Sequence, residues 1–483
     1  MSTHESLYVD GRWSPPSSTA TCSVVCPSTE RVIGQVPDCD DVDVDTAVAA
    51  ARQAFDVGPW PRLGVDERAE ILLSALTVLG SKVAEIAHIV TLEMGSPISV
   101  SQVTVPTALS RGEYFVRLAQ AEPLLDVRRG NQTALVLREP VGVIASIAPW
   151  NGPFSMAITK IIPALAAGCA VVFKPAGETP LDSYLLADAL DSAGVPPGVF
   201  NLLTGGRATG RHLVAHRGID KVSFTGSTVA GREIGRVCGE KVRPVQLELG
   251  GKSAAIVLDD ADIDVTMKAM SAGCFTNSGQ MCIAFSRVLV TRARYREVTD
   301  ALCDTARSFR LGDPLDPATT MGPVVTEDQR QRVEEYIESG VAEGAELRVG
   351  GKRPSGMSRG WFVEPTVFGS AHNSMRICQE EIFGPVVAVI PFDGIDDAIR
   401  IANDSDFGLH GGVFTSDEEA ALAIAKSVRT GTFSINNFVY NIEAPFGGLK
   451  MSGIGRDTGR EAIQSYLGLK TINIPSPMVG RFT

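Results

Sequence analysis

The spacing of apolar residues divides the chain into two regions. Residues 42–55 and 65–94 carry apolar side chains at helical spacing and are rich in Ala and Leu, so they are predicted to form amphipathic helices. From Val141 onward, short apolar or β-branched runs alternate with helix-length segments rich in Ala, Leu and Gly. This alternation is typical of βαβ units and predicts an α/β fold with a parallel sheet.

The predicted strands form two series. The first comprises VGVIASIAP, AVVFKP, KVSFTG and SAAIVLDD. The second begins with RVLVT and continues with a helix near 329–343, strands near 362–368 and 386–391, and a helix over 398–403. Two successive α/β layers account for the chain length better than one layer does.

Two further segments lie outside this rhythm of strands and helices. Leu125 to Glu139 predicts a hairpin that turns around residues 129–131, and KTINIPSP near the C-terminus predicts one more strand. Because neither segment has a place in the βα rhythm, we expect them to form an extension that pairs with another subunit.

The composition is that of a large globular protein. The 483 residues correspond to about three domains of ~150 residues, and 44% apolar residues supply material for large cores. The formal net charge of −12 disfavours nucleic acid and anionic membranes as partners. The apolar stretch 161–173 contains Pro163 and is shorter than the ~20 residues of a membrane-spanning helix. Because the N-terminus shows no secretory signal, we expect a cytoplasmic protein.

The nine cysteines are scattered and odd in number, which does not match a dense disulfide framework. Cys22 and Cys26 lack a second pair or nearby histidines, so no metal site is predicted. Cys282 stands in the polar, turn-prone stretch FTNSGQMCIAFSR, between a predicted helix and a predicted strand. A nucleophile there is accessible, and backbone N–H groups could stabilise its thiolate and later an oxyanion. An inert buried thiol is the alternative.

Two polar residues near strand ends are candidates for catalysis. Glu248 ends the strand-like run PVQLE just before Gly250 and Gly251. A carboxylate that is partly desolvated there would have a raised pKa, as a general base for water requires; a solvated glutamate beside a turn is the alternative. Asn151 follows the predicted strand 141–148 and could direct an amide donor at an oxyanion, although Asn before Gly is also a common turn pair.

A nucleotide site is indicated at two other strand ends. The strand AVVFK ends in Lys174, and the strand KVSFT leads into a Gly-Ser-Thr turn that opens a helix. A glycine before a helix N-terminus leaves N–H groups free for a phosphate, so Gly226, Ser227 and Gly231 are candidate binding residues. The chain has no G-x-G-x-x-G, so any dinucleotide must be held in a different way.

Seven motifs together resemble those of one family. They are PWN (149–151), KPAGETP (174–180), FTGST (224–228), LELGGK (247–252), GQMC (279–282), EEIFGP (380–385) and PFGGLKMSGIGRD (445–457). The set closely resembles the aldehyde dehydrogenase superfamily, occurs in the family's order and covers nearly the whole chain. LELGGK followed by GQ-x-C is the most specific combination.

The resemblance implies an architecture of three parts. Residues 1–123 and 141–251 would form a Rossmann-type NAD(P)-binding domain, and residues 252–448 a catalytic α/β domain. Residues 124–140 and 467–483 would form a β-hairpin oligomerisation arm, which implies a homodimer or homotetramer.

The resemblance also implies roles for single residues. Cys282 would be the nucleophile, Glu248 the general base, and Asn151 part of the oxyanion hole with the Cys282 backbone N–H. The implied cofactor residues are Lys174 at the adenine ribose, Trp150 and Ser227 along the pyrophosphate, Glu381 and Phe383 at the nicotinamide riboside, and Thr225, Gly226 and Gly231 around the helix start. The implied reaction oxidises an aldehyde to the carboxylate through a Cys282 thiohemiacetal and a thioester, which water activated by Glu248 hydrolyses.

One departure from the family pattern concerns the cofactor. Many NAD-using relatives read Lys-Pro-Ser/Ala-Glu, whereas this chain has Lys174-Pro175-Ala176-Gly177, with Glu178 one place later. The usual glutamate accepts hydrogen bonds from the ribose hydroxyls and repels a 2′-phosphate, and Gly177 removes both effects. NADP is therefore admissible, although NAD is favoured because no arginine stands immediately beside Lys174.

Four apolar residues are candidates for lining a substrate tunnel: Phe154, Met156, Phe285 and Phe446. They favour an apolar or aromatic aldehyde, with ordinary core packing as the alternative for each. Lys160 could relay protons, or it could be an ordinary solvated or salt-bridged lysine. A CoA-acylating or semialdehyde-type relative and a nonenzymatic protein with the same fold remain alternative functions. Glu248 argues against CoA acylation, and the intact set of Cys282, Glu248 and Asn151 argues against loss of activity.

Overall fold

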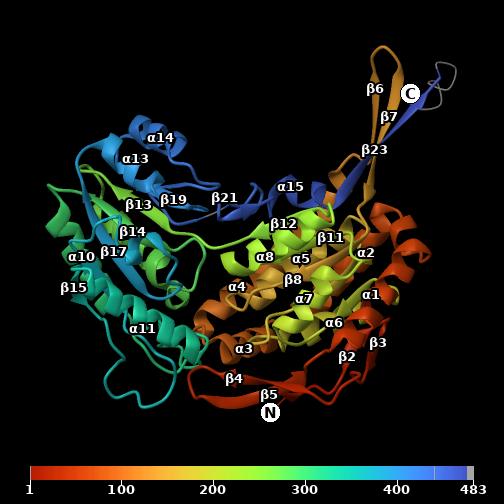
Figure 1. Cartoon of the computed structure of the whole chain (residues 1–483), viewed down its shortest axis with the longest axis horizontal. Coiled ribbons are helices and arrows are strands. Elements are labelled where there is room, and N and C mark those ends of the chain that lie inside the picture. The colour runs from red at the N-terminus through yellow and green to blue at the C-terminus, as the bar shows by residue number, and fades with distance from the viewer. Residues whose placement is uncertain (1, 440, 476–483) are drawn as a thin grey trace.

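The computed structural model describes residues 2–439 and 441–475. Two α/β lobes lie side by side, and a narrow β-sheet projects from one of them (Figure 1). The lobes are built on an eight-stranded and a seven-stranded sheet. The α/β fold with parallel sheets predicted from the sequence is confirmed.

The eight-stranded sheet has the order β22-β12-β11-β8-β9-β10-β2-β3. Its five central strands are parallel, and β22, β2 and β3 are antiparallel to their neighbours. Almost every residue of the central strands is buried, as expected for a parallel sheet covered on both faces. The strands span Gly453–Ile454 (β22), Val245–Glu248 (β12), Lys221–Thr225 (β11), Val143–Ile147 (β8), Ala170–Lys174 (β9), Phe200–Leu202 (β10), Leu7–Val9 (β2) and Arg12–Ser14 (β3).

Helices cover both faces of this sheet, because alternate strand residues enter two separate cores. Val171 and Phe173 of β9 pack in the core that contains α2 to α6, whereas Ala170 and Val172 pack in the core that contains α1, α7 and α8. The helices span Asp41–Asp56 (α1), Val65–Gly80 (α2), Val83–Met94 (α3), Ile98–Ala121 (α4), Pro153–Ala166 (α5), Asp182–Ser192 (α6), Arg207–Ala215 (α7) and Thr228–Glu240 (α8).

The helix predicted over residues 65–94 is two helices in the structure. The α2 and α3 axes meet at 71°, and the break follows Gly80. The helix is weakened at Gly80, because glycine has a low helix propensity. The apolar period continues through this point, so the period alone did not reveal the break. Within the described ranges, no single helix is long and apolar enough to cross a membrane, and this bent pair meets the length and composition criteria jointly.

The seven-stranded sheet has the order β15-β16-β17-β14-β13-β19-β20 and is parallel except for β15. Its strands span Glu346–Val349 (β15), Thr366–Gly369 (β16), Val386–Phe392 (β17), Phe285–Thr291 (β14), Ser253–Val257 (β13), Gly411–Phe414 (β19) and Ser434–Ile435 (β20). Its helices span Ile263–Met270 (α9), Tyr295–Arg307 (α10), Glu327–Ala342 (α11), Arg376–Gln379 (α12), Ile395–Asn403 (α13) and Glu418–Ser427 (α14).

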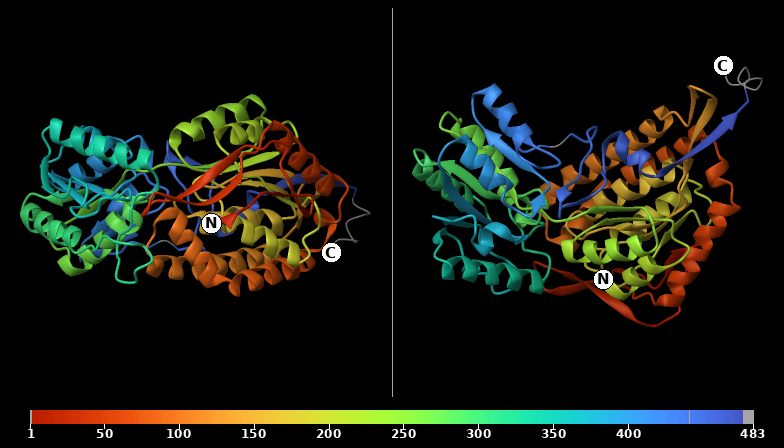
Figure 2. Two further views of the ribbon diagram at one scale, coloured as in Figure 1. Left: turned by 90° about the horizontal axis from the view of Figure 1, so that it is seen from below. Right: turned by 45° about the horizontal axis from the view of Figure 1, so that its top comes forward.

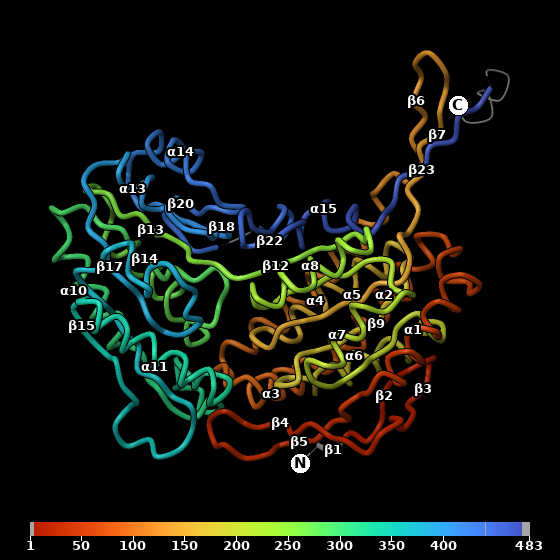
Figure 3. Tube along the Cα trace, in the orientation of Figure 1, coloured from red at the N-terminus to blue at the C-terminus, as the bar shows by residue number. Residues whose placement is uncertain are grey.

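The chain crosses from one sheet to the other between β12 and β13, as the tube in Figure 3 shows. The run SAAIVLDD, which sequence reasoning placed in the first series of strands, therefore contributes β13 to the second sheet. Apolar pattern identified the strand but not its partners. Only residues 249–252 separate β12 from β13, and the two glycines among them lie at the crossing.

The projecting sheet consists of β6 (Leu125–Arg129), β7 (Thr133–Pro140) and β23 (Leu467–Ile474), in the order β23-β7-β6. Figure 2 shows it standing clear of both lobes. The predicted hairpin and C-terminal strand are confirmed, and residues 476–483 of the predicted arm lie outside the described residues. The remaining elements are β1 (Ser2–Thr3), β4 (Thr21–Cys26), β5 (Arg31–Pro37), β18 (Phe407–Gly408), β21 (Leu449–Lys450), α15 (Gly459–Gln464) and 3₁₀ helices at Trp60–Arg62 and Thr276–Gly279.

Candidate active site

Predicted catalytic residues meet where β12 of the first sheet ends and β13 and β14 of the second begin. Glu248 is the last residue of β12, and Cys282 precedes β14 by three residues. A Cβ atom at position 251 would lie 2.3 Å from the Cys282 carbonyl oxygen, and one at position 250 would lie 2.2 Å from Glu381 Oε2. The two glycines of LELGGK therefore allow three loops to approach more closely than any side chain would permit.

The Cys282 loop is tightly constrained. Asn277 and Ser278 have φ of 55° and Gly279 has φ of 70°, so three consecutive residues adopt left-handed backbone. Gln280 fixes the turn, because its Oε1 accepts from the Val325 N–H at 2.9 Å and its Nε2 donates to the Asn277 oxygen at 3.1 Å. A π-helical turn at Ser271–Phe275 precedes it. Such irregular backbone is common at functional sites.

The Cys282 thiol is half-buried and has a pKa raised to about 12. Burial is the main cause, followed by the carboxylates of Glu381 and Glu248, and the backbone N–H groups of Cys282 and Ile283 offset these effects only in part. From the sequence, these N–H groups were expected to stabilise the thiolate. In the structure they are outweighed, so attack by sulfur requires a nearby group that accepts the thiol proton.

Asn151 is tied to the cysteine loop by hydrogen bonds in both directions. Its Nδ2 donates to the Gln280 carbonyl at 2.9 Å, and Asn277 Nδ2 donates to the Asn151 carbonyl at 3.0 Å. The bond to Gln280 uses one of the two amide hydrogens. The arrangement thus fixes an amide beside the loop that carries Cys282.

Glu248 is 3% exposed, and neither of its carboxylate oxygens has a hydrogen-bond partner among the described residues. Burial raises its pKa well above the usual range, and the Asp457 carboxylate adds to the increase, whereas Lys160 and Arg456 oppose it. A Cβ atom at position 447 would lie 2.5 Å from Glu248 Oε1, so Gly447 makes room for the carboxylate. This is the raised pKa that the sequence argument required of a general base.

A buried polar cluster stands next to Glu248. Lys160 Nζ forms an ion pair with Asp457 Oδ2 at 3.4 Å and lies 3.2 Å from Ser223 Oγ. Gln246 Nε2 donates to the other oxygen of Asp457. Lys160 is therefore salt-bridged rather than solvated. Sequence reasoning did not single out Asp457 or Gln246, because only the sheet pairing of β22 with β12 brings them together.

The candidate phosphate site lies at the carboxyl ends of β9 and β11, as expected for a ligand of an open α/β sheet. Ser227 is the N-cap of α8, and its side chain accepts from the Ala230 N–H at 3.3 Å. The Thr225 and Thr228 hydroxyls are buried without a hydrogen-bond partner in the described part of the chain. Such orphaned groups beside a helix N-terminus fit a polar, phosphate-bearing ligand.

Three other residues shape this site. A Cβ atom at position 226 would lie 2.5 Å from Phe224 Cζ, and one at position 231 would lie 2.3 Å from Leu249 Cδ2. Both glycines therefore permit close packing around the start of α8. Val229, in the first turn of α8, is 80% exposed and offers an apolar surface beside the polar groups.

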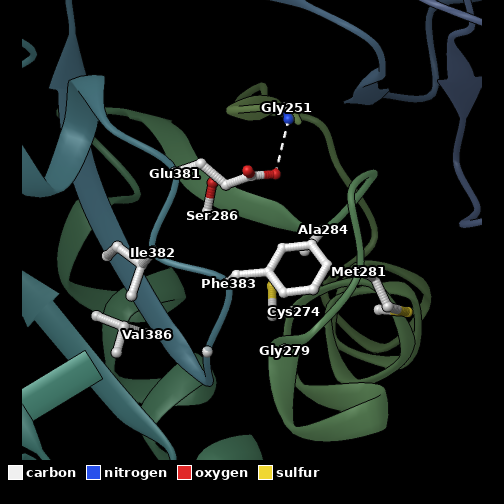
Figure 4. A pocket seen from close by; sticks show the side chains of 11 residues that line it. Gly251, Cys274, Gly279, Met281, Ala284, Ser286, Glu381, Ile382, Phe383 and Val386 are labelled. Atoms are coloured by element: carbon white, nitrogen blue, oxygen red, sulfur yellow. Dashed lines mark hydrogen bonds between the residues drawn. The ribbon is translucent and has the colours of Figure 1, made fainter. Parts of the chain in front are cut away.

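Glu381 and Phe383 line a pocket beside the cysteine loop (Figure 4). Glu381 Oε1 accepts from the Gly251 N–H at 2.9 Å, and burial raises the Glu381 pKa to about 7. The Phe383 ring packs edge-on against Trp150, with ring centroids 5.2 Å apart. This contact joins a residue after β8 to a residue before β17, so Trp150 packs against one of the residues that line the pocket.

The predicted tunnel residues divide into two pairs. Phe154 is 2% exposed within the core beneath α5, and Phe285 is fully buried and stacks on His410 at 5.3 Å. Both side chains pack in hydrophobic cores, which agrees with the core-packing alternative for these two residues. Met156 and Phe446 are half-buried and remain candidates.

Phe438 was missed by sequence reasoning. It is half-buried, packs edge-on against Phe285 at 5.1 Å and lies in the same connection as Phe446. All nine cysteines are unpaired. Among residues 2–439 and 441–475, no three His, Cys, Asp or Glu side chains converge in a geometry that could hold a metal ion.

Comparison with known proteins adds independent findings. Residues 13–472 match the family model described as the aldehyde dehydrogenase family. Geranial dehydrogenase of Castellaniella defragrans is 45% identical over 472 residues, which cover 97% of this chain and 98% of the relative. A 3-succinoylsemialdehyde-pyridine dehydrogenase of a Pseudomonas species is 41% identical over 475 residues, covering 98% and 99%.

A solved structure is also similar along the full length. The crystal structure of an aldehyde dehydrogenase from Mycobacterium tuberculosis in complex with NAD⁺ superimposes with a TM-score of 0.95 at 42% identity. The match covers 98% of this chain and 99% of that chain. The two proteins are therefore similar in fold, in chain length and in sequence.

Proposed function

The chain belongs to the aldehyde dehydrogenase family, and on that premise we propose that Cys282, Glu248 and Asn151 carry the chemistry. The chain is an NAD-dependent oxidoreductase that oxidises an aldehyde to the acid. The observation that carries the proposed residue roles is the meeting of the Cys282 loop with the end of β12 at Gly250 and Gly251.

In the first proposed stage, Cys282 Sγ forms a bond to the aldehyde carbon while its proton passes to a base. Two carboxylates with raised pKa values, Glu248 and Glu381, lie near the thiol. We assign the transfer to Glu248, because neither of its oxygens has a hydrogen-bond partner among the described residues, whereas Glu381 accepts from the Gly251 N–H. The oxyanion of the resulting thiohemiacetal would accept hydrogen bonds from the Asn151 amide and the Cys282 backbone N–H. When bound, NAD⁺ supplies the acceptor for the hydride that leaves the thiohemiacetal carbon.

In the second stage, a thioester remains on Cys282, and Glu248 has released the proton of the thiol to solvent. Glu248 then takes a proton from water, whose oxygen attacks the thioester carbon. The C–S bond breaks, the proton on Glu248 passes to the leaving sulfur, and the acid product ionises to the carboxylate. The covalent route through the thioester divides one difficult oxidation into two easier steps. The Lys160–Asp457 pair sets the electrostatic environment of Glu248, since the two charges shift its pKa in opposite directions.

The residues at the cofactor crevice fit NAD⁺. We propose that Ser227, Thr225, Gly226 and Gly231 hold the phosphates at the start of α8 and that Lys174 binds the adenine ribose. Trp150 would lie along the pyrophosphate with Ser227, and Glu381 and Phe383 would position the nicotinamide riboside beside Cys282. The orphaned hydroxyls and the crowded glycines support these roles.

The raised pKa of Glu248 predicts the pH dependence of turnover. Glu248 acts as a base only when ionised, so lowering the pH protonates it and slows the reaction. We expect kcat to fall on the acid side with an apparent pKa well above the ~4.3 of an exposed glutamate. Steady-state NADH formation measured between pH 5 and pH 9 checks this. A kcat that stays constant until exposed glutamates titrate would contradict the proposed base.

We propose an apolar or aromatic aldehyde as substrate. Met156, Phe438 and Phe446 supply half-buried apolar surface, and the related geranial dehydrogenase is named for an apolar aldehyde. Each CH₂ group buried contributes about 0.8 kcal/mol, so kcat/KM should rise about fourfold per carbon over a series of unbranched aldehydes. Succinic semialdehyde is the charged control. A kcat/KM that is highest for the semialdehyde would overturn this substrate class.

We propose that the projecting sheet pairs with another subunit. Leu125, Leu469 and Ile472 are 43%, 69% and 38% exposed on it, which is unusual for a sheet that faces solvent. Both a homodimer and a homotetramer agree with this observation. Light scattering of the full chain distinguishes them, and a monomer at micromolar concentration would contradict the proposal.

A further inference from the structure

The ring of Phe285, three residues after Cys282, is packed against backbone segments that carry glycine. A Cβ atom at position 412 would lie 2.7 Å from Phe285 Cζ, and one at position 273 would lie 2.7 Å from Phe285 Cδ2. Position 273 belongs to the π-helical turn before the cysteine loop. A side chain at either position would displace the ring, so Phe285 fills a fixed place beside the loop that carries Cys282.

Phe438 packs against the same place from a distant part of the chain. Its ring lies edge-on to Phe285 with centroids 5.1 Å apart, and its Cδ2 would lie 2.9 Å from a Cβ atom at position 273. Phe438 therefore contacts both segments that flank the Cys282 loop in sequence. The Phe438 side chain is only half-buried, so part of it is left open to a ligand.

His410, which directly precedes β19, completes this aromatic cluster. Its ring stacks on Phe285 with centroids 5.3 Å apart and lies edge-on to Phe438 at 5.7 Å. His410 is 3% exposed, and burial lowers its pKa to about 4, so at neutral pH the ring is uncharged and carries a single N–H. A ring this deeply buried acts on a ligand only through its neighbours.

Both ring nitrogens of His410 have a hydroxyl partner. Nδ1 lies 2.8 Å from Thr432 Oγ1, and Nε2 lies 3.4 Å from Ser434 Oγ. The Thr432 hydroxyl also lies 3.1 Å from the Leu409 carbonyl oxygen, and the Ser434 hydroxyl lies 3.0 Å from the Val439 carbonyl oxygen. The ring and the two hydroxyls each have one hydrogen to donate, so one of the four contacts is left without a hydrogen.

The Leu409 carbonyl is the acceptor that does not need a hydroxyl, because the Thr432 backbone N–H already donates to it at 3.0 Å. The Thr432 hydroxyl then donates to Nδ1, Nε2–H donates to Ser434 Oγ, and the Ser434 hydroxyl donates to the Val439 carbonyl. In the opposite tautomer Ser434 donates to the ring, and the Val439 carbonyl loses its hydroxyl donor. The first tautomer gives a continuous chain of hydrogen bonds from His410 to Val439.

This chain of hydrogen bonds ends in the turn that carries Phe438. Ser434 lies in β20 and Val439 follows it by five residues, so their bond closes the segment around Phe438. Asn436 anchors the same segment to β19, because its side chain accepts from the Thr415 N–H at 3.0 Å and donates to the Thr415 carbonyl at 2.8 Å. The place of Phe438 therefore depends on two anchors, and one of them leads back to the ring of His410.

Resting on the substrate site proposed above, we propose that His410 is a positioning residue that holds Phe438 against Phe285 through Ser434 and so sets the preference for longer apolar aldehydes. His410 and Phe285 are buried, so Phe438 is the member of the cluster that meets the alkyl chain of a substrate. A Phe438 ring released from its place would lose contact with that chain without disturbing the reacting carbon.

Steady-state kinetics of the full chain with NAD⁺, using acetaldehyde and hexanal, tests this role. In Ser434→Ala we expect kcat/KM for hexanal to fall about tenfold, as loss of a buried hydrogen bond implies, and kcat/KM for acetaldehyde to change less than about twofold. The loss should appear in KM, with kcat nearly unchanged. Ser434→Cys, which keeps a weaker donor, should recover part of the loss. Ser427→Ala is the matched control, because it too removes a hydroxyl that donates to a backbone carbonyl, at the exposed end of α14.

A second variant tests the chain of hydrogen bonds from the ring. His410→Phe keeps a ring against Phe285 but has no N–H, so it should change the kinetics in the same direction as Ser434→Ala. Because both changes break one chain of bonds, the double variant should lose little more than either single variant. Effects that multiply in the double variant, or equal losses for the two aldehydes, would overturn the proposal.

The behaviour of wild type separates this proposal from the one on which it rests. If wild type does not favour hexanal over acetaldehyde, the proposed substrate class fails and the positioning role fails with it. If wild type favours hexanal and Ser434→Ala favours it equally, only the positioning role of His410 fails.

Discussion

Replacing Cys282 with alanine is expected to lower NADH formation by about a thousandfold or more, because the substrate loses its covalent attachment. Without sulfur at this position, the aldehyde carbon cannot become the tetrahedral thiohemiacetal from which hydride leaves. The loop itself should persist, since Gln280 and Ser278 hold it through bonds that do not involve the thiol.

The matched control for this variant is Cys303→Ala. Cys303 is buried on α10, within the core of the second sheet and away from the crossing of the two lobes. We expect the Cys303→Ala variant to retain activity. Its activity measures how much the removal of a buried cysteine by itself lowers turnover. Calorimetric binding of NAD⁺ to Cys282→Ala should stay close to wild type. Appreciable turnover by a folded Cys282→Ala protein would disprove the nucleophile assignment.

Glu248→Gln is expected to separate the two stages of the reaction. Glutamine keeps the shape of the side chain but cannot accept a proton, so thioester hydrolysis should slow by about a hundredfold or more. The thiol also needs a proton acceptor, so the first turnover should slow as well, to a smaller degree, since hydroxide can assist there. A burst of NADH close to one per active site, followed by a slow steady state, is the expected time course.

Stopped-flow absorbance at the NADH band measures both phases. Glu240→Gln is the control. It makes the same chemical change outside the site, because Glu240 is exposed at the end of α8. An unaltered steady-state rate in Glu248→Gln would exclude Glu248 as the base for water. Loss of the burst together with the steady state would show that the first stage limits the variant, which contradicts the expected larger effect on hydrolysis.

The local sequence predicted where the strands and helices of this fold lie better than it predicted which strands pair with each other. Apolar runs located the strands that became β8, β9, β11, β13 and β14, because buried parallel strands read as continuous apolar stretches. The same runs could not show that SAAIVLDD joins the second sheet, since hydrogen-bond partners depend on the path of the chain at Gly250 and Gly251. The break after Gly80 was hidden for a related reason, because the apolar period continues through it.

For the site, residue type and motif pointed to Cys282, Glu248 and Asn151, which the fold brings to one crossing. What the sequence could not show was direction and environment. Phe154 and Phe285 turned out to face cores, whereas the half-buried Phe438 gave no motif signal. The opposing effects of Lys160 and Asp457 on Glu248 depend on a contact between residues far apart in the chain.

The most direct test of covalent catalysis at Cys282 is the mass of the trapped enzyme. Glu248→Gln is mixed with an unbranched aldehyde and NAD⁺, quenched in acid within the burst and digested for mass spectrometry. The account predicts that the peptide carrying Cys282 gains the mass of the acyl group less one hydrogen, in step with the NADH released. NADH released with no acyl group on Cys282, or with the acyl group on another residue, would contradict it.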